Sequence, residues 1–276
     1  MTGKVQHKTL GWLNQMITSA SNQKIKLVRS LQSKNRSRLD ENAFVAEGVR
    51  LLEEAVTVQW PIKYVFYDET LSERGQILID QLRTVPGLEI EEIPPSLMAD
   101  ISDTETPQGI LAVLEKKTLS LPQTPSFLII ADQIRDPGNM GTLLRTAEAA
   151  AADGVLLFPG TVDTFSPKVI RAGMGAHFHL PILAVDWGEI KTIANNMPVY
   201  LADSGGGKSL WEADMRRACA LLIGGEAFGA SPQGEEIATD KITIPMPGRA
   251  ESLNAAIAAG ILIAEVLRQR SISKKD

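Results

Sequence analysis

The pattern of hydrophobic and polar positions predicts two structural modules along the 276-residue chain. In the first, apolar residues spaced by three indicate two helices around a turn, and short apolar runs beyond them indicate strands. The predicted elements are helices over residues 25–31, 46–56 and 77–85 and strands over residues 61–69, 88–93 and 109–116. Residues 20–115 therefore read as an α/β module, preceded by an N-terminal extension over residues 1–19.

The second module follows a linker over residues 116–126, which contains two prolines and several Ser and Thr residues. Beyond the linker, continuous apolar runs alternate with helical segments, as in parallel strands that are covered on both faces. The predicted strands span residues 127–132, 154–158, 179–185, 198–203, 219–225 and 241–246, with helices around 138–152 and 166–175 and from 253. Residues 127–270 are thus expected to form an open, mostly parallel sheet with crossover helices. Residues 271–276 are expected to be a disordered tail.

Ligands of such sheets bind beyond the carboxyl ends of the strands, so the loops after the strands are candidate sites. The first loop leads through Pro137 into a helix that begins near Gly138 or Asn139. The predicted buried stripe of that helix consists of Met140, Leu144, Ala147 and Ala151. Arg145 lies beside the stripe, about 9 Å along the axis from Asn139. It is a candidate clamp for a phosphate, and pairing with Glu148 at i+3 explains its position equally well.

Two later loops are also unusual. In GEAFGAS, Gly225 and Gly229 bracket Glu226 and allow close approach of the backbone to a ligand. Glu226 either contacts that ligand or accepts backbone N–H bonds within its own loop.

In IPMPGRAESLN, two prolines and a glycine exclude both a helix and a central strand. Ser252 is the predicted N-cap of a helix that begins at Leu253, and Asn254 adds a side-chain donor and acceptor. That helix is apolar on nearly all sides, which predicts burial between the sheet and another body such as a second subunit.

Charge is distributed unevenly along the chain. The net charge is −5, yet residues 1–39 contain eight Lys and Arg and no Asp or Glu. The cluster in this segment consists of Lys24, Lys26, Arg29, Lys34, Arg36 and Arg38. It is typical of phosphate contacts to nucleic acid, and equally of a solvated helix face or a basic transit sequence.

Several classes of protein are disfavoured. No apolar run is long enough to span a membrane, and no secretory signal is recognisable, so a cytoplasmic protein is expected. The single cysteine, Cys219, excludes a disulfide framework and a cysteine-based metal site. DSGGGKSL lacks the first glycine of a phosphate-binding loop, where Ala202 stands. His177 and His179 alternate as on a strand without carboxylates at matching spacing, so no metal site is expected.

Three loops in order resemble the motifs of the SpoU (TrmH-type) RNA ribose 2′-O-methyltransferases. The matching segments are NMGTLLRTA, LLIGGEAFGAS and IPMPGRAESLNAAIAAG, with FSPKVIRAGMGAHFHLPI between the first two. The segments NQKIKLVRSLQSKNRSR and FVAEGVRLLEEA resemble the L30e-like substrate-binding domain that many members carry. The resemblance covers about residues 20–268, although Ala-Ala replaces the more usual Val-Ser after Asn254.

The resemblance implies a fold, a cofactor and an assembly. Members have an α/β catalytic domain of the SPOUT type with a deep trefoil knot, which forms the S-adenosylmethionine pocket and the homodimer interface. By the same resemblance, Gly224, Ile244 and Leu253 contact the cofactor through their backbone, with Glu226, Gly229 and Met246 nearby. Asn139, Arg145, Ser252 and Asn254 take the catalytic positions, without a metal. Arg145 is either the base or, since a guanidinium stays protonated, a phosphate clamp.

The expected function is therefore S-adenosylmethionine-dependent methylation of a ribose 2′-hydroxyl, with ribosomal RNA as the substrate. The basic cluster and Arg171 are the expected RNA contacts. A transfer-RNA methyltransferase and a non-catalytic RNA-binding protein of the same fold are the alternatives. The sequence does not name the RNA or the nucleotide, and it does not separate a housekeeping role from antibiotic resistance.

Overall fold

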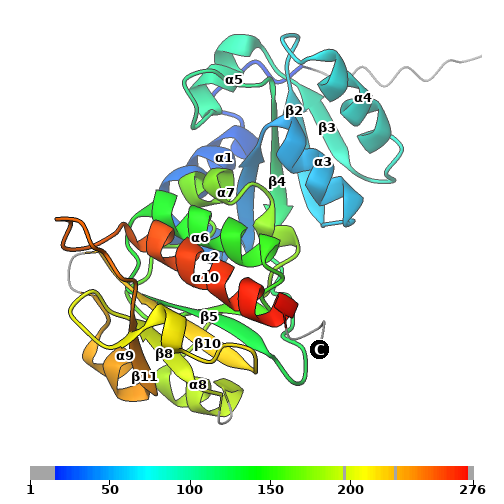
Figure 1. Ribbon diagram of the computed structural model, residues 1–276. Coiled ribbons are helices and arrows are strands. Elements are labelled where there is room, and N and C mark those ends of the chain that lie inside the picture. Colours follow the sequence, from blue (N-terminus) through cyan, green and yellow to red (C-terminus); the bar gives the residue numbers. More distant parts are fainter. Residues whose placement is uncertain (1–15, 195–196, 227–228, 273–276) are drawn as a thin grey trace, which may run out of the picture.

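The computed structural model describes residues 16–194, 197–226 and 229–272 and contains two β-sheets, each covered by helices. The smaller sheet and its helices form the upper part of the molecule in Figure 1, and the larger sheet lies below. We call these parts the N-terminal and the C-terminal module.

The N-terminal module is a four-stranded sheet in the order β1-β4-β2-β3. Strand β4 pairs antiparallel with β1 and β2, whereas β2 and β3 are parallel. Its strands are β1 (Ala43–Glu47), β2 (Ile62–Tyr67), β3 (Glu89–Glu92) and β4 (Ile110–Glu115), and its helices are α1 (Gln23–Ser33), α2 (Asn35–Asp40), α3 (Val49–Thr57), α4 (Glu73–Leu82) and α5 (Pro95–Ile101). Successive residues of β1 face opposite sides, so Phe44 packs in one core and Val45 in the other.

Strand β1 corrects the prediction of two helices joined by a turn over residues 20–56. Residues 43–46 are buried on both faces of the strand, and such a short apolar run cannot be told from a helix by its periodicity. The second helix accordingly begins at Val49, after Gly48 with φ of 106°. Helices α2 and α5 were not predicted either, because each is shorter than two full turns.

The C-terminal module is a seven-stranded sheet in the order β7-β6-β5-β10-β8-β11-β9. All of its strand pairs are parallel, which confirms the expected mostly parallel α/β fold. The strands are β5 (Phe127–Asp132), β6 (Gly154–Leu157), β7 (Ile182–Ala184), β8 (Val199–Ala202), β9 (Lys208–Ser209), β10 (Cys219–Gly224) and β11 (Asp240–Thr243).

Helices cover both faces of this sheet. Helices α6 (Pro137–Ala149), α7 (Pro167–Gly173) and α10 (Ala255–Ile272) share one core, and α8 (Trp187–Ala194) and α9 (Pro232–Ile237) pack on the other side. Two 3₁₀ turns, η1 (Ala176–Phe178) and η2 (Leu210–Glu212), complete the module. Ala151, expected in the buried stripe of α6, lies beyond the helix with φ of 52° and is exposed.

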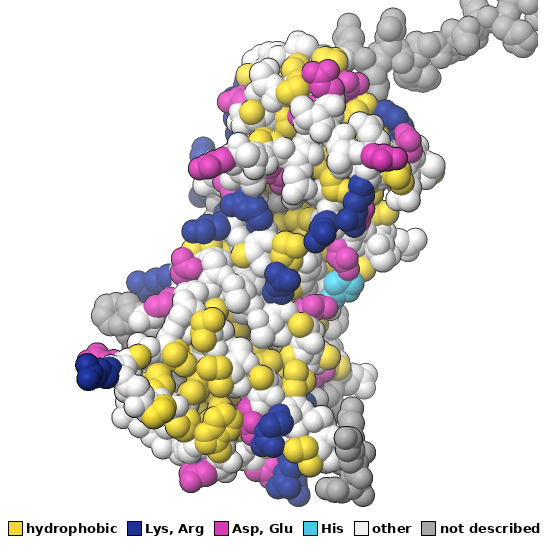
Figure 2. All heavy atoms as spheres, turned by 45° about the horizontal axis from the view of Figure 1, so that its top comes forward, with side chains coloured by type: hydrophobic (Ala, Val, Ile, Leu, Met, Phe, Trp, Pro, Cys, Tyr) yellow, Lys and Arg dark blue, Asp and Glu magenta, His cyan; other side chains and the backbone are white. Residues whose placement is uncertain are grey.

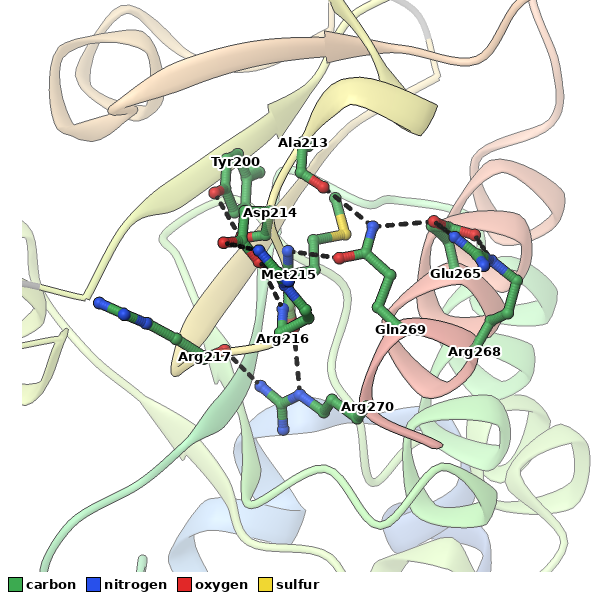
Figure 3. Close-up of polar contacts among 10 residues, drawn as sticks. All are labelled: Tyr200, Ala213, Asp214, Met215, Arg216, Arg217, Glu265, Arg268, Gln269 and Arg270. Atoms are coloured by element: carbon green, nitrogen blue, oxygen red, sulfur yellow. Dashed lines mark hydrogen bonds and ion pairs between the residues drawn. The ribbon is translucent and has the colours of Figure 1, made fainter. Parts of the chain in front are cut away.

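The last two turns of α10 are anchored by a polar network (Figure 3). The buried Gln269 side chain accepts from the Met215 N–H at 2.8 Å and donates to the Ala213 carbonyl at 2.9 Å. It also donates to Glu265, whose carboxylate pairs with Arg268 at 2.7 Å. Helix α10 therefore reaches Ile272, so residues 271 and 272 are not part of a disordered tail, and residues 273–276 lie outside the described residues.

Candidate active site

The start of α6 places the first candidate side chain at the carboxyl edge of the large sheet. Strand β5 ends at Asp132, and α6 begins at Pro137 with Asp136 as its N-cap. The Asp136 carboxylate accepts from the Asn139 N–H at 2.8 Å. This cap fixes the first turn of α6, so that the Asn139 side chain projects from a rigid position.

Asn139 connects the three loops that the sequence singled out. Its Nδ2 amide donates to Glu226 Oε1 at 2.6 Å, and its Oδ1 accepts from Asn254 Nδ2 at 2.8 Å. Glu226 follows β10 and Asn254 precedes α10, so one hydrogen-bonded chain joins the ends of β5, β10 and β11. Among the described residues, Glu226 makes this contact to another loop and accepts no backbone N–H of its own loop.

Asn254, rather than Ser252, is the N-cap of α10. The helix begins at Ala255, and Asn254 Oδ1 accepts from the Ala256 and Ile257 N–H groups at 3.0 and 3.2 Å. The prediction that Ser252 caps a helix from Leu253 is therefore wrong. Both Ser252 and Asn254 are residue types that cap helices. The hydrogen bond from Asn254 to Asn139 favours Asn254 as the cap.

A cavity of about 490 Å³ opens beside this chain of side chains. It lies between the carboxyl ends of β8, β10 and β11 and the start of α10. All six residues expected to bind the cofactor line it, namely Gly224, Glu226, Gly229, Ile244, Met246 and Leu253, together with Ser252. Its volume lies within the range of small-molecule sites.

The loop after β10 is tightly folded around the cavity. A Cβ on Gly224 would lie 2.4 Å from the Ala230 nitrogen, and Gly229 adopts a φ of 68° with open space beside it. The fully buried Asp132 at the end of β5 holds this loop in place. Its carboxylate accepts from the Ser231 N–H at 2.7 Å and from the Ser231 hydroxyl at 2.8 Å. Sequence reasoning missed this support, although a carboxylate at the end of a buried apolar strand was a usable signal.

The loop after β8, which lacks the pattern of a phosphate-binding loop, also lines the cavity. Asp203 accepts from the Gly205 N–H at 2.7 Å and pairs with Lys241 at 3.0 Å. Burial by itself would raise the pKa of Asp203, but the Gly205 N–H and Lys241 together lower that pKa below its ordinary value. The carboxylate is thus kept ionised and orders the turn over residues 203–205.

Arg145 does not line the cavity. It lies six positions after Asn139 on α6, which at 3.6 residues per turn rotates it about 120° away from the Asn139 side. Its side chain is exposed, and no ion pair joins it to Glu148 or to any other described residue. The structure therefore leaves this guanidinium free to contact another molecule.

The basic N-terminal cluster is largely neutralised by nearby carboxylates. Lys24 contacts Glu89 and Glu91, Arg29 contacts Asp100, and Arg36 lies 3.3 Å from Asp40. Arg171 likewise pairs with Asp103 at 2.7 Å.

Three members of the cluster differ from these exposed ion pairs, one by being buried and two by having no carboxylate partner. Arg38 is 4% exposed and pairs with Asp163, so its burial contradicts the expected direct contact with RNA. Lys26 and Lys34 are exposed and form no ion pair within the part of the chain that the structure describes. Residues 1–15, with the remaining basic residues of the segment, lie outside the described residues.

His177 and His179 have local partners and do not lie on a strand. The buried His177 is in η1 and donates from Nε2 to the Thr164 carbonyl at 2.8 Å, and His179 pairs with Glu54 at 2.6 Å. Within the described ranges no three His, Cys, Asp or Glu side chains could hold a metal ion. Burial raises the pKa of the Cys219 thiol, so the thiol stays protonated. Over the same ranges, no helix is long and apolar enough to cross a bilayer.

Comparisons with known proteins give the same two modules. The SpoU rRNA methylase family matches residues 126–264, and the MRM3-like substrate binding domain matches residues 22–112. The chain is 35% identical over 254 residues to the 23S rRNA (guanosine(2553)-2′-O)-methyltransferase RlmP of Bacillus subtilis (strain 168), covering 90% of this chain and 97% of that protein.

Solved structures of related proteins include the cofactor. The SpoU methyltransferase AviRb from Streptomyces viridochromogenes in complex with AdoMet superposes with a TM-score of 0.82 at 29% identity, over 91% of this chain and 98% of that chain. The AdoMet-bound rRNA methyltransferase from Sinorhizobium meliloti superposes with a TM-score of 0.81 at 30% identity, over 92% and 97% of the two chains. The resemblance noted in the sequence is thereby confirmed, and the chain belongs to the SpoU rRNA methylase family.

Proposed function

We propose that the protein is an S-adenosylmethionine-dependent methyltransferase that modifies a ribose 2′-hydroxyl of ribosomal RNA. The observation that carries this proposal is the cavity beside the Asn139–Asn254 hydrogen bond. All six residues expected to bind the cofactor line that cavity, although they come from two loops that are separated in the sequence. The ribosomal substrate is supported by the printed names of the relatives, which act on 23S rRNA.

The cavity suits a nucleoside with a polar tail. Ile223, Ile242 and Ile244 provide an apolar wall, and the backbone of residues 224–226 and 229 provides donors and acceptors. A Cβ at Gly224 would collide with the loop itself, so the chain is built for close backbone approach here. Asp203 and Glu235 at the rim share the ammonium of Lys241, which leaves one net negative charge that favours the sulfonium and the amino group of the cofactor.

The residues around the cavity have separable roles in the reaction. S-adenosylmethionine supplies an activated methyl group, and the protein orients the 2′-hydroxyl and assists the loss of its proton. Asn139 and Asn254 hold each other and Glu226 in place, and Ser252 presents a hydroxyl at the cavity wall. Arg145 is assigned to the RNA phosphate, because its guanidinium stays protonated and is a poor base.

The two modules divide the work. Residues 20–115 bind the RNA, residues 116–126 link the modules, and residues 127–270 catalyse the transfer. Lys26 and Lys34 are the exposed, unpaired members of the basic cluster and become its main RNA contacts. The cytoplasmic location expected from the sequence is also part of the proposal.

A homodimer through the C-terminal module and a trefoil knot in that module are part of the proposal. Helix α10 packs one side on the sheet but leaves Ile257 and Leu267 55% and 43% exposed. Figure 2 shows many hydrophobic side chains on the C-terminal part, whereas basic and acidic side chains are interspersed over the N-terminal part. A second copy over α6 and α10 would cover these apolar side chains. Sedimentation of the purified protein measures the assembly.

The function is tested with purified protein, S-adenosylmethionine carrying a labelled methyl group, and protein-free 23S rRNA or transfer RNA. We expect label in 23S rRNA in dinucleotides that resist alkaline hydrolysis, because a methylated 2′-oxygen cannot attack the neighbouring phosphate. Label confined to transfer RNA would instead support the transfer-RNA alternative.

Titration calorimetry tests the cavity separately from catalysis. Gly224→Ala should abolish cofactor binding, because its Cβ meets backbone at 2.4 Å. The matched control is Gly248→Ala, where nothing lies within 4 Å of the added carbon. A folded wild-type protein that binds neither the cofactor nor its demethylated product would contradict the proposed function.

A further inference from the structure

A buried ion pair joins the two modules. Arg38 Nε donates to Asp163 Oδ2 at 2.6 Å, and the two side chains are only 5% and 15% exposed. Each of the other ion pairs among the described residues has at least one side chain more exposed than either of these. A charge pair withdrawn from water in this way is costly unless its geometry is fixed, and it specifies one arrangement rather than adding much stability.

Both partners are held rigidly within their own module. The Arg38 guanidinium also donates to the carbonyls of Leu31 and Gln32 at the end of α1. Asp163 uses its second oxygen, Oδ1, to accept from the Phe165 N–H at 2.9 Å. If one module moved relative to the other, either the ion pair or these local hydrogen bonds would break. The ion pair therefore fixes the position of one module relative to the other.

Aromatic contacts also cross between the two modules. The Phe165 ring lies 5.1 Å from Phe44, and Trp60 lies 5.1 Å from Phe178 across the same junction. Burial lowers the pKa of Lys116, whose ammonium stands 4.7 Å above the Phe165 ring. Apolar contacts of this kind favour association of the modules but are non-directional. The ion pair therefore sets their relative orientation.

The turn at Asp163 is connected to α6 through α7. It continues into α7, which lies between the N-terminal module and α6 (Figure 1). Helices α6 and α7 pack so closely that a Cβ on Gly141 would lie 2.4 Å from the Ala172 Cβ. A displacement at Asp163 is therefore transmitted to α6, which carries Asn139 and Arg145.

We propose that Arg38 and Asp163 are positioning residues for methyl transfer. They fix the RNA held by the N-terminal module at the distance and angle at which its ribose reaches the cavity. This inference rests on the proposed function. A misplacement of about 1 Å can lower the rate of an oriented reaction by up to roughly a hundredfold, even when binding is intact.

The test compares Asp163→Asn and Arg38→Met with the control Arg74→Met, which removes a 58% exposed guanidinium that pairs with Glu53 within the N-terminal module. Asp163→Asn keeps the acceptor for the Phe165 N–H but places an amide donor against Arg38. We expect both junction variants to lower the single-turnover rate about tenfold or more with cofactor and RNA saturating. Their affinities for the cofactor and for RNA should stay near the wild-type values, and the control should react normally.

Two outcomes would overturn the inference. Folded junction variants that react at the wild-type rate would show that the pair only adds stability. A parallel loss of cofactor affinity would show that the pair acts by supporting the fold of the sheet. If Arg38→Met does not fold, the near-isosteric Asp163→Asn carries the test.

Small-angle scattering tests the junction without using activity. The scattering of Asp163→Asn should indicate a wider spread of module arrangements than in the wild type, and an unchanged profile would contradict the inference. The wild-type protein could prove inactive while Asp163→Asn still shows the expected wider spread of arrangements. That result would overturn the proposed function but leave the role of the ion pair in fixing the modules intact.

Discussion

Asn139 and Asn254 lie 115 residues apart in the sequence, and the Nδ2 amide of Asn254 donates to Oδ1 of Asn139 at 2.8 Å. The same Asn254 side chain caps α10 through its Oδ1 atom. A single amide thus connects the beginning of α6 to the beginning of α10 at the rim of the cavity. This double use allows the cap and the contact between loops to be separated by mutation.

Asn254→Asp should keep the cap and lose the contact, because a carboxylate accepts from the N–H groups of α10 but cannot donate to Asn139. We expect near-normal thermal stability and a large loss of methyl transfer. Asn254→Ala should lose both, and removal of the cap should cost about 1 kcal/mol of unfolding free energy. Chemical denaturation and a methylation assay on both variants make the comparison. Equal activity of Asn254→Asp and wild type would remove Asn254 from the catalytic machinery.

Arg145→Ala should abolish methyl transfer while cofactor affinity stays unchanged, because Arg145 lies outside the cavity on an exposed part of α6. Arg145→Lys should also fail, since an ammonium cannot reproduce the planar fork that binds a phosphate. Calorimetry with the cofactor and a single-turnover assay measure the two properties. A collapse of cofactor affinity in Arg145→Ala would identify a structural role.

Replacing Lys26 and Lys34 together by Ala should weaken RNA binding. The dependence of log affinity on log salt should flatten by up to about 0.7 for each lost contact to single-stranded RNA. The matched control replaces Lys24 and Arg29, which carboxylates of the same module already neutralise. Filter binding over a series of salt concentrations measures the slopes. If the control pair changed the slope more, the internal ion pairs would have to open for RNA.

Gln269→Leu should lower the free energy of unfolding by about 2–4 kcal/mol. The change leaves the Met215 N–H and the Ala213 carbonyl without their partner in a buried place (Figure 3). Gln81→Leu makes the same substitution at an exposed position of α4 and should change stability little. Urea denaturation gives both values. A small effect at Gln269 would mean that water replaces the lost hydrogen bonds.

Acid should lower the free energy of unfolding through the buried His177. Burial lowers the pKa of His177 from 6.5 to about 4, so the unfolded chain binds a proton more readily between these values. The stabilisation is complete above pH 6.5 and is lost as the pH falls to about 4, a change of about 3 kcal/mol. The drop in unfolding free energy from pH 7 to pH 4 should be smaller in His177→Gln. His179→Gln, which removes a half-exposed imidazole, should retain the full drop.

The sequence determined the type of the C-terminal module and which of its loops line the cavity. Continuous apolar runs such as residues 127–132 and 219–223 can be satisfied only between two layers of helices, which dictates a parallel sheet. Parallel strands bring their carboxyl ends to one edge, so the loops at 224–229 and 244–254 could be predicted to meet. The observed lining of the cavity by both loops agrees with this reasoning.

Tertiary structure decided what depends on contacts between distant segments. The sequence predicted Ser252 as the cap of α10, whereas in the structure Asn254 is the cap and its side chain is held by Asn139. Arg38 looked like its basic neighbours in the sequence, but only the docking of the modules places Asp163 against it and buries it. Local patterns encode which face of an element is apolar, whereas the partner of the buried Arg38 comes from a segment 125 residues away in the sequence.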